Sequence, residues 1–72
     1  MAKIATDVVV IEFVVVAGVR RIQEFRVIGS AKPCQGFLAV GKRVRAAERC
    51  LLTHGFKLLA SSRDVLVFTR PS

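Results

Sequence analysis

Acidic residues are scarce in this chain, which has five Asp and Glu against twelve Lys and Arg. The five carboxylates stand singly along the sequence, so the paired acid and base that many hydrolases use are not indicated. The formal net charge of +7 over 72 residues predicts a positive potential around the whole molecule. Nucleic acids, DNA or RNA, are therefore the expected partners.

Cysteine and histidine are also rare, being limited to Cys34, Cys50 and His54. These side chains fall one short of the four ligands of a closed structural zinc site, so no metal site is predicted within one chain. Small secreted domains stapled by disulfides usually carry more cysteines. Two cysteines instead favour a reducing, cytoplasmic location with free thiols, and a single Cys34–Cys50 bridge is the alternative.

Tryptophan and tyrosine are absent, and the only aromatic residues are five Phe. Stacking on nucleic-acid bases needs exposed rings. The positions of Phe13, Phe37, Phe56 and Phe68 fit a hydrophobic core better, and Phe25 is also assigned to the core. We therefore expect contacts with nucleic acid to be made mainly to phosphates.

Long apolar runs are missing as well. The longest, residues 8–17, is shorter than the roughly 20 residues of a membrane helix, so no membrane association is expected. Asp7 and Glu12 argue against a signal peptide in this region. Glycine-rich phosphate-binding motifs are also absent, and no cofactor is predicted.

The apolar patterns predict one α+β domain over residues 1–72, in which one amphipathic helix packs on an antiparallel sheet. Gly18 separates two β-rich segments, and its tolerance of positive φ suits a tight reversal. Apolar residues at spacings of three and four then predict a helix that ends at Gly55. The chain order is strand, strand, helix, strand, strand, with strands at residues 6–17, 19–28, 56–60 and 65–69.

The start of the helix has two alternatives. The apolar periodicity allows the helix to begin as early as Phe37. Alternatively, residues 36–40 form a short additional strand and the helix begins near Lys42. Residues 70–72 are expected to be loose. The apolar stripe that supports the longer helix is Phe37, Val40, Val44, Ala47 and Leu51.

Both faces of the first strand are mostly apolar, although a helix can cover only one of them. The second face therefore needs another cover. Without disulfides or metal, a core of this size supplies only about 3–5 kcal/mol, which also favours association. We expect a homodimer whose interface includes Val8, Val10, Val14 and Val16.

Two groups of basic residues are candidate contacts for nucleic acid. In the first, a spacing of three and four aligns most members along the predicted helix, beside the apolar stripe. In the second, alternation on the strand places Arg20 and Arg26 on one face and Arg21 on the other. A solvated surface that only maintains solubility is the alternative. The first group is Lys42, Arg43, Arg45 and Arg49, and the second is Arg20, Arg21 and Arg26.

His54 stands beside Gly55 at the predicted end of the helix, where a protonated imidazole would interact favourably with the helix dipole. The functional alternatives make it a general acid or base in a ribonuclease-like reaction, or the partner of a Cys34 thiolate. Cys50 lies one turn earlier, so the pair could supply two ligands to a metal between subunits. None of these patterns is specific enough to assign a catalytic or metal-binding residue.

The expected function is therefore that of a small basic accessory or regulatory protein that binds nucleic acid as a homodimer through phosphate contacts. The alternative is a protein-interaction module, an inhibitor or a subunit, that docks a partner on its apolar sheet face. An enzyme that uses His54 is a third class, and the absence of a specific catalytic pattern makes it the weakest.

Overall fold

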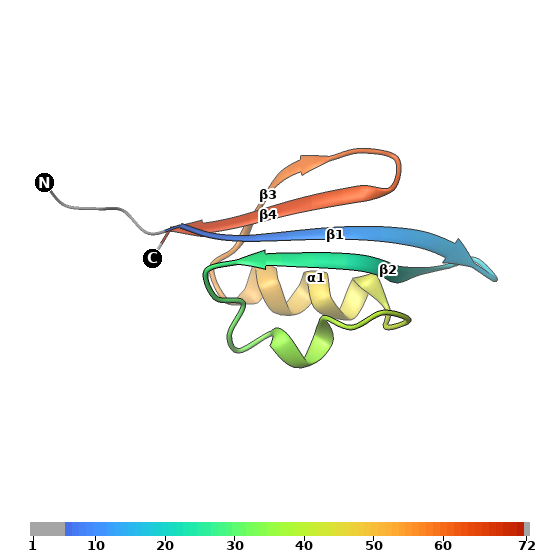
Figure 1. The fold of residues 1–72 in the computed structure, drawn as a ribbon, viewed down its shortest axis with the longest axis horizontal. Helices are drawn as coiled ribbons and strands as arrows, with labels where there is room; N and C mark the ends of the chain where they lie inside the picture. The colour runs from blue at the N-terminus through green and yellow to red at the C-terminus, as the bar shows by residue number, and fades with distance from the viewer. Residues whose placement is uncertain (1–5, 72) are drawn as a thin grey trace, which may run out of the picture.

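The computed structural model describes residues 6–71, which form a four-stranded antiparallel sheet with helical segments on one side of it (Figure 1). The α+β fold and the chain order strand, strand, helix, strand, strand are confirmed. A 3-10 helix, η1, precedes the α-helix, α1. The elements are β1 (Thr6–Val16), β2 (Val19–Ile28), η1 (Gln35–Phe37), α1 (Val44–Thr53), β3 (Lys57–Ser61) and β4 (Val65–Pro71).

The spatial order of the strands is β2-β1-β4-β3, which differs from their order in the chain. The difference arises because β1 pairs with its sequence neighbour β2 on one side and with the last strand, β4, on the other. The β1–β2 hairpin turns at Ala17 and Gly18, whose φ angles are +51° and +79°. Two positive φ angles match the right-handed twist of the strands, and the predicted reversal at Gly18 is confirmed.

The core lies between α1 and the sheet face that carries alternate residues of β1. Val9 and Ile11 are completely buried there. From the helix, Val44, Ala47 and Leu51 are completely buried against them, which confirms this part of the apolar stripe. Phe68 of β4 adds the largest fully buried side chain. The opposite face of the sheet carries Val8, Val10, Val14 and Val16 of β1. No element within residues 6–71 covers this face.

An irregularity in β2 changes the predicted faces of that strand. Glu12 pairs with Glu24 and Phe13 pairs with Ile22, so Gln23 is an extra residue on β2. Before this bulge, Arg20 shares the helix side of the sheet with Ile22, whereas after it Arg26 lies on the open face, opposite Val10. The prediction that Arg20 and Arg26 share a face is therefore wrong, because a bulge shifts the alternation by one residue.

The segment before α1 contains neither the early helix nor the short strand predicted for it. Residues 35–37 form η1 rather than a strand, and α1 begins at Val44, close to the alternative start near Lys42. Phe37 and Val40 are exposed and lie outside α1. Two backbone hydrogen bonds attach this segment to the edge of β2, one from the Gly41 amide to the Ile22 carbonyl and one from the Ile22 amide to the Lys42 carbonyl, each 2.8 Å long. This pairing, together with the φ of +90° at Gly41, prevents a helix from forming earlier.

Candidate functional site

A cleft of about 280 Å³ lies where the β1–β2 hairpin turn meets the start of α1. Its side-chain charges come from Arg20 on β2 and from Arg43 and Arg45 at the beginning of α1. Gly18 and Val19 complete the lining. We call this feature the arginine cleft, and it brings together members of both predicted basic groups.

The local structure explains why these three arginines line the same cleft. The guanidinium carbon of Arg20 lies 5.3 Å from the centre of the Phe13 ring, which keeps this side chain on the helix side of the sheet. Arg43 forms an isolated β-bridge with Arg21 and is also the N-cap residue of α1. Within the described residues, the first turn of α1 has neither a side-chain cap nor an acidic residue. Its free amide groups therefore add positive potential beside the cleft.

The remaining predicted basic residues have different positions. Arg21 donates a hydrogen bond of 3.2 Å to the Gly41 carbonyl at the sheet edge. Lys42 precedes α1, so the prediction that it shares a helical row with Arg45 and Arg49 is wrong for Lys42. Arg49 follows Arg45 by one turn on α1 and is exposed. Arg26, on the opposite face of the sheet, does not join the cleft.

Internal ion pairing does not neutralise this surface. Between residues 6 and 71, the structure contains one ion pair, formed by Arg70 and Asp7. The cleft arginines have no carboxylate partner among those residues. They are consequently available to an external anion.

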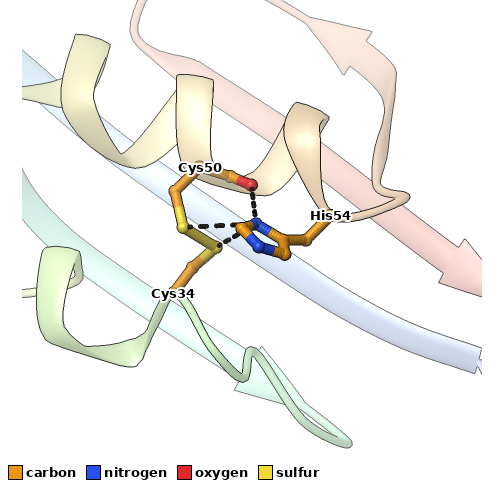
Figure 2. A group of neighbouring side chains, drawn as sticks. All are labelled: Cys34, Cys50 and His54. Carbon is orange, nitrogen blue, oxygen red and sulfur yellow. Dashed lines mark hydrogen bonds between the residues drawn. A yellow bond between two sulfur atoms is a disulfide. The ribbon is translucent and has the colours of Figure 1, made fainter.

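The second candidate site is the cluster of Cys34, Cys50 and His54 (Figure 2). The two cysteines form a disulfide with a Cα–Cα distance of 5.8 Å, so the expectation of free thiols is wrong for this structure. The Nδ1 atom of His54 lies 3.8 Å from the Cys34 Sγ atom and 3.7 Å from the Cys50 Sγ atom. The same nitrogen is 2.9 Å from the Cys50 carbonyl oxygen. The imidazole thus faces both sulfur atoms.

The end of α1 positions one half of this cluster. Cys50 and His54 are one helical turn apart, as their spacing predicts. Gly55 follows with a φ of +91°, and the Phe56 amide donates a 3.0 Å hydrogen bond to the Leu51 carbonyl. This is the hydrogen bond that closes a helix in a Schellman motif. The α1 terminus is therefore well defined, and it fixes the direction in which His54 leaves the helix.

A buried ion pair positions the other half. The Arg70 guanidinium donates to the Asp7 carboxylate at 2.8 and 3.1 Å. It also donates to three backbone carbonyls, those of Ser30 and Lys32 in the loop before Cys34 and that of His54. Arg70 therefore ties together β1, β4, the loop and the end of α1. We call this arrangement the Asp7–Arg70 clamp.

The Asp7–Arg70 clamp corrects the expectation of a loose C-terminus. Arg70 and Pro71 belong to β4, whereas Ser72 lies outside the described residues. The guanidinium carbon of Arg70 also lies 4.3 Å from the centre of the Phe56 ring. A hydrogen bond from the Ser30 amide and those from Arg70 hold the pKa of Asp7 below its usual value. The carboxylate form of Asp7 is therefore part of the native structure. The sequence contains no local pattern that would pair residues so far apart.

The open face of the sheet carries the four valines predicted as an oligomer interface. Val8 and Val10 are half-buried, whereas Val14 and Val16 are 45% and 53% exposed. Glu12 interrupts this row, directly opposite Glu24. Hydrogen bonding to and repulsion from Glu24 raise the pKa of Glu12 above its usual value. The open face therefore combines valines with the Glu12–Glu24 pair and with Arg26 opposite Val10, and its role in assembly stays a prediction.

Comparison with known proteins identifies no relative, because no family model, curated protein or solved structure matches the chain significantly. In the part of the chain that the structure describes, no helix combines the length and apolar character needed to cross a bilayer. Functional inference therefore starts from the arginine cleft and the cysteine–histidine cluster.

Proposed function

We propose that this protein is a small nucleic-acid-binding accessory or regulatory protein that contacts phosphate groups through the arginine cleft. The observation that carries the proposal is the convergence of Arg20, Arg43 and Arg45 at the uncapped start of α1. Guanidinium groups bind phosphate oxygens in a bidentate fashion, and the amides of a helix N-terminus add favourable partial charge. The net charge of +7 supports the same type of partner.

The neighbouring cations extend the proposed contact surface. Lys42 lies next to Arg43, and Arg49 lies one turn along α1 from Arg45, so a phosphate backbone can follow the outer side of the helix. Arg21 lies at the adjoining sheet edge. Contacts of this kind position a nucleic acid without reading its bases, so they do not favour DNA over RNA.

A homodimer and a cytoplasmic location complete the proposal. The open valine face and the arginine cleft lie on opposite sides of the sheet. A second copy placed on the valine face would leave both clefts accessible. In the reducing cytoplasm, Cys34 and Cys50 would be thiols rather than a disulfide.

The binding proposal can be tested with two double variants that remove the same charge. Arg43→Gln/Arg45→Gln alters the cleft, and Lys32→Gln/Arg63→Gln alters exposed basic residues elsewhere. Fluorescence anisotropy would measure affinity for labelled duplex DNA, single-stranded DNA and RNA over a series of salt concentrations. For the cleft variant, we expect the affinity to fall on the order of 10- to 100-fold, and the slope of log K against log salt to become shallower by about two.

The control variant should lose much less affinity, because its two substituted residues lie outside the cleft. Equal losses in the two variants would mean that only the overall charge matters. Wild-type binding that is absent at low salt, or that does not respond to salt, would contradict the proposal.

The second candidate function is a protein-interaction module that docks a partner on the open face. It is favoured by the exposure of large apolar side chains there, including Val14, Val16 and the 63% exposed Ile28. Val14→Lys is expected to reduce the assembled mass to that of a monomer, as measured by size-exclusion chromatography with light scattering. Val40→Lys is the matched control, because Val40 is 70% exposed and lies outside the sheet. A wild-type protein that is already monomeric contradicts self-association through this face.

A further inference from the structure

We infer that Cys34, Cys50 and His54 form a redox-controlled Zn²⁺ site that the disulfide closes and reduction opens. The site lies at the end of α1 away from the arginine cleft. The inference goes beyond the proposed nucleic-acid binding and does not depend on it. Thiolate and imidazole are the ligands that zinc prefers, and they occur together here in one small cluster.

The distances in the cluster suit tetrahedral coordination. The two sulfur atoms and a ring nitrogen all lie within 4.8 Å of one another. Zinc binds sulfur at about 2.3 Å and imidazole nitrogen at about 2.0–2.1 Å, so adjacent sulfur and nitrogen ligands lie about 3.6 Å apart. The observed Nδ1 to Sγ distances of 3.7 and 3.8 Å are close to this separation. After reduction, the sulfur atoms need to separate to about 3.8 Å, a distance compatible with the 5.8 Å between the two Cα atoms.

The histidine tautomer changes when the metal binds. In the disulfide form, the 2.9 Å contact places a proton on Nδ1, which donates to the Cys50 carbonyl. Coordination through Nδ1 transfers that proton to Nε2, and solvent can accept a hydrogen bond there because His54 is exposed. The Cys50 carbonyl keeps a partner, since it also accepts a 3.1 Å hydrogen bond from the His54 backbone amide. Metal binding therefore leaves no buried polar group unsatisfied.

One side of the proposed metal position is buried in the protein, and the other side is open to solvent. Cys34 is completely buried, Cys50 is half-buried and His54 is exposed. A zinc ion at the rim can thus enter from solvent. Three protein ligands leave a fourth position for water or for a ligand from another molecule. The Asp7–Arg70 clamp holds the backbone on both sides of the cluster, through the Lys32 and His54 carbonyls.

The disulfide form and the zinc-bound form interconvert through a two-electron redox step and an exchange of two protons for Zn²⁺. A dithiol reductant transfers two electrons and two protons to the disulfide, which yields two thiols and the oxidised reductant. Zn²⁺ then replaces the two thiol protons, so two zinc–sulfur bonds form and two protons leave. A small-molecule disulfide reverses the process: it accepts two electrons and leaves as two thiols, while both thiolates are oxidised to the Cys34–Cys50 bridge and Zn²⁺ is released.

Metal binding can be measured on the full chain in its reduced and oxidised forms. Elemental analysis after gel filtration with Zn²⁺ should give one zinc per reduced chain and none per oxidised chain. Titration of the reduced protein with Co²⁺ should produce thiolate charge-transfer absorption and the visible bands of a tetrahedral site, and Zn²⁺ should abolish both. His54→Asn should weaken zinc binding on the order of 100-fold or more, because losing an outer-sphere partner alone costs about 10- to 100-fold.

Two controls keep the result decisive. Thr53→Ala changes an exposed neighbour and should bind zinc as the wild type does, whereas Cys34→Ala/Cys50→Ala should not bind it. If the reduced metal-free chain is unfolded, Zn²⁺ should restore its far-ultraviolet circular dichroism in the wild type but not in His54→Asn. The inference is overturned if the reduced wild type retains no zinc, or if His54→Asn binds zinc as tightly as the wild type.

Discussion

Reducing the Cys34–Cys50 disulfide in the absence of metal is expected to lower the free energy of unfolding by about 3 kcal/mol. The two cysteines are 16 residues apart, and a bridge that closes a loop of this size restricts the unfolded chain by about that amount. A core built from so short a chain supplies only about 3–5 kcal/mol. The disulfide is therefore expected to contribute a large part of the stability of the oxidised protein.

For a domain of this size, such a change corresponds to a decrease in Tm of roughly 12–24 °C. Thermal or urea unfolding, followed by circular dichroism with a chelator present, measures it in oxidised and reduced protein. Cys34→Ala/Cys50→Ala should unfold at the same temperature with and without reductant. Superimposable oxidised and reduced curves for the wild type would show that the bridge is absent or contributes nothing.

Arg70→Met is expected to lower the free energy of unfolding by a clearly measurable amount, because it removes one member of a partly buried ion pair. The Arg70 and Asp7 side chains keep 19% and 10% of their surface exposed, so the loss should be smaller than for a fully buried pair. The substitution leaves the Asp7 carboxylate without its cation, and it also removes donors from three loop and helix carbonyls. Urea unfolding at neutral pH measures the effect, and Arg49→Met, an exposed arginine on α1, should change stability little.

The pH dependence identifies the carboxylate as the origin of this effect. The pKa of Asp7 is lowered in the native state, first by the Ser30 amide and then by Arg70. The resulting stability is present above the unfolded-state pKa of about 3.9 and is lost as the pH falls through the lowered native pKa. The difference between wild type and Arg70→Met should therefore narrow between neutral pH and strong acid. A difference that stays constant over this range would mean that Arg70 acts only through groups that do not titrate, namely the three backbone carbonyls and the Phe56 ring.

Local patterns in the sequence predicted the elements that depend on neighbouring residues. The β-rich composition of residues 6–17 and 19–28 identified both long strands, and Gly18 identified the reversal between them. The spacing of Val44, Ala47 and Leu51 identified the buried side of α1. In each case the determinant is a periodic contact with the core or a backbone angle, and both are properties of residues close together in the chain.

Features that depend on distant residues could not be predicted in this way. The extra residue at Gln23 leaves no trace in composition, because both faces of β2 contain apolar and charged side chains. The start of α1 depends on hydrogen bonds between residues 41–42 and Ile22, on another element. The arginine cleft and the cysteine–histidine cluster likewise combine residues that only the tertiary fold brings together.

The bulge at Gln23 gives β2 one point at which the number of residues in the strand can change. The bulge divides the strand into two short segments. The side chain that faces the core is Ile22 before the bulge and Phe25 after it. Gln23 itself is exposed, so many side chains would serve at this position. A chain without Gln23 would keep Ile22 inward, Glu24 outward and Phe25 inward in regular alternation. Deletion of Gln23 should consequently be tolerated far better than deletion of a residue elsewhere in the strand, which would turn part of β2 to the wrong face.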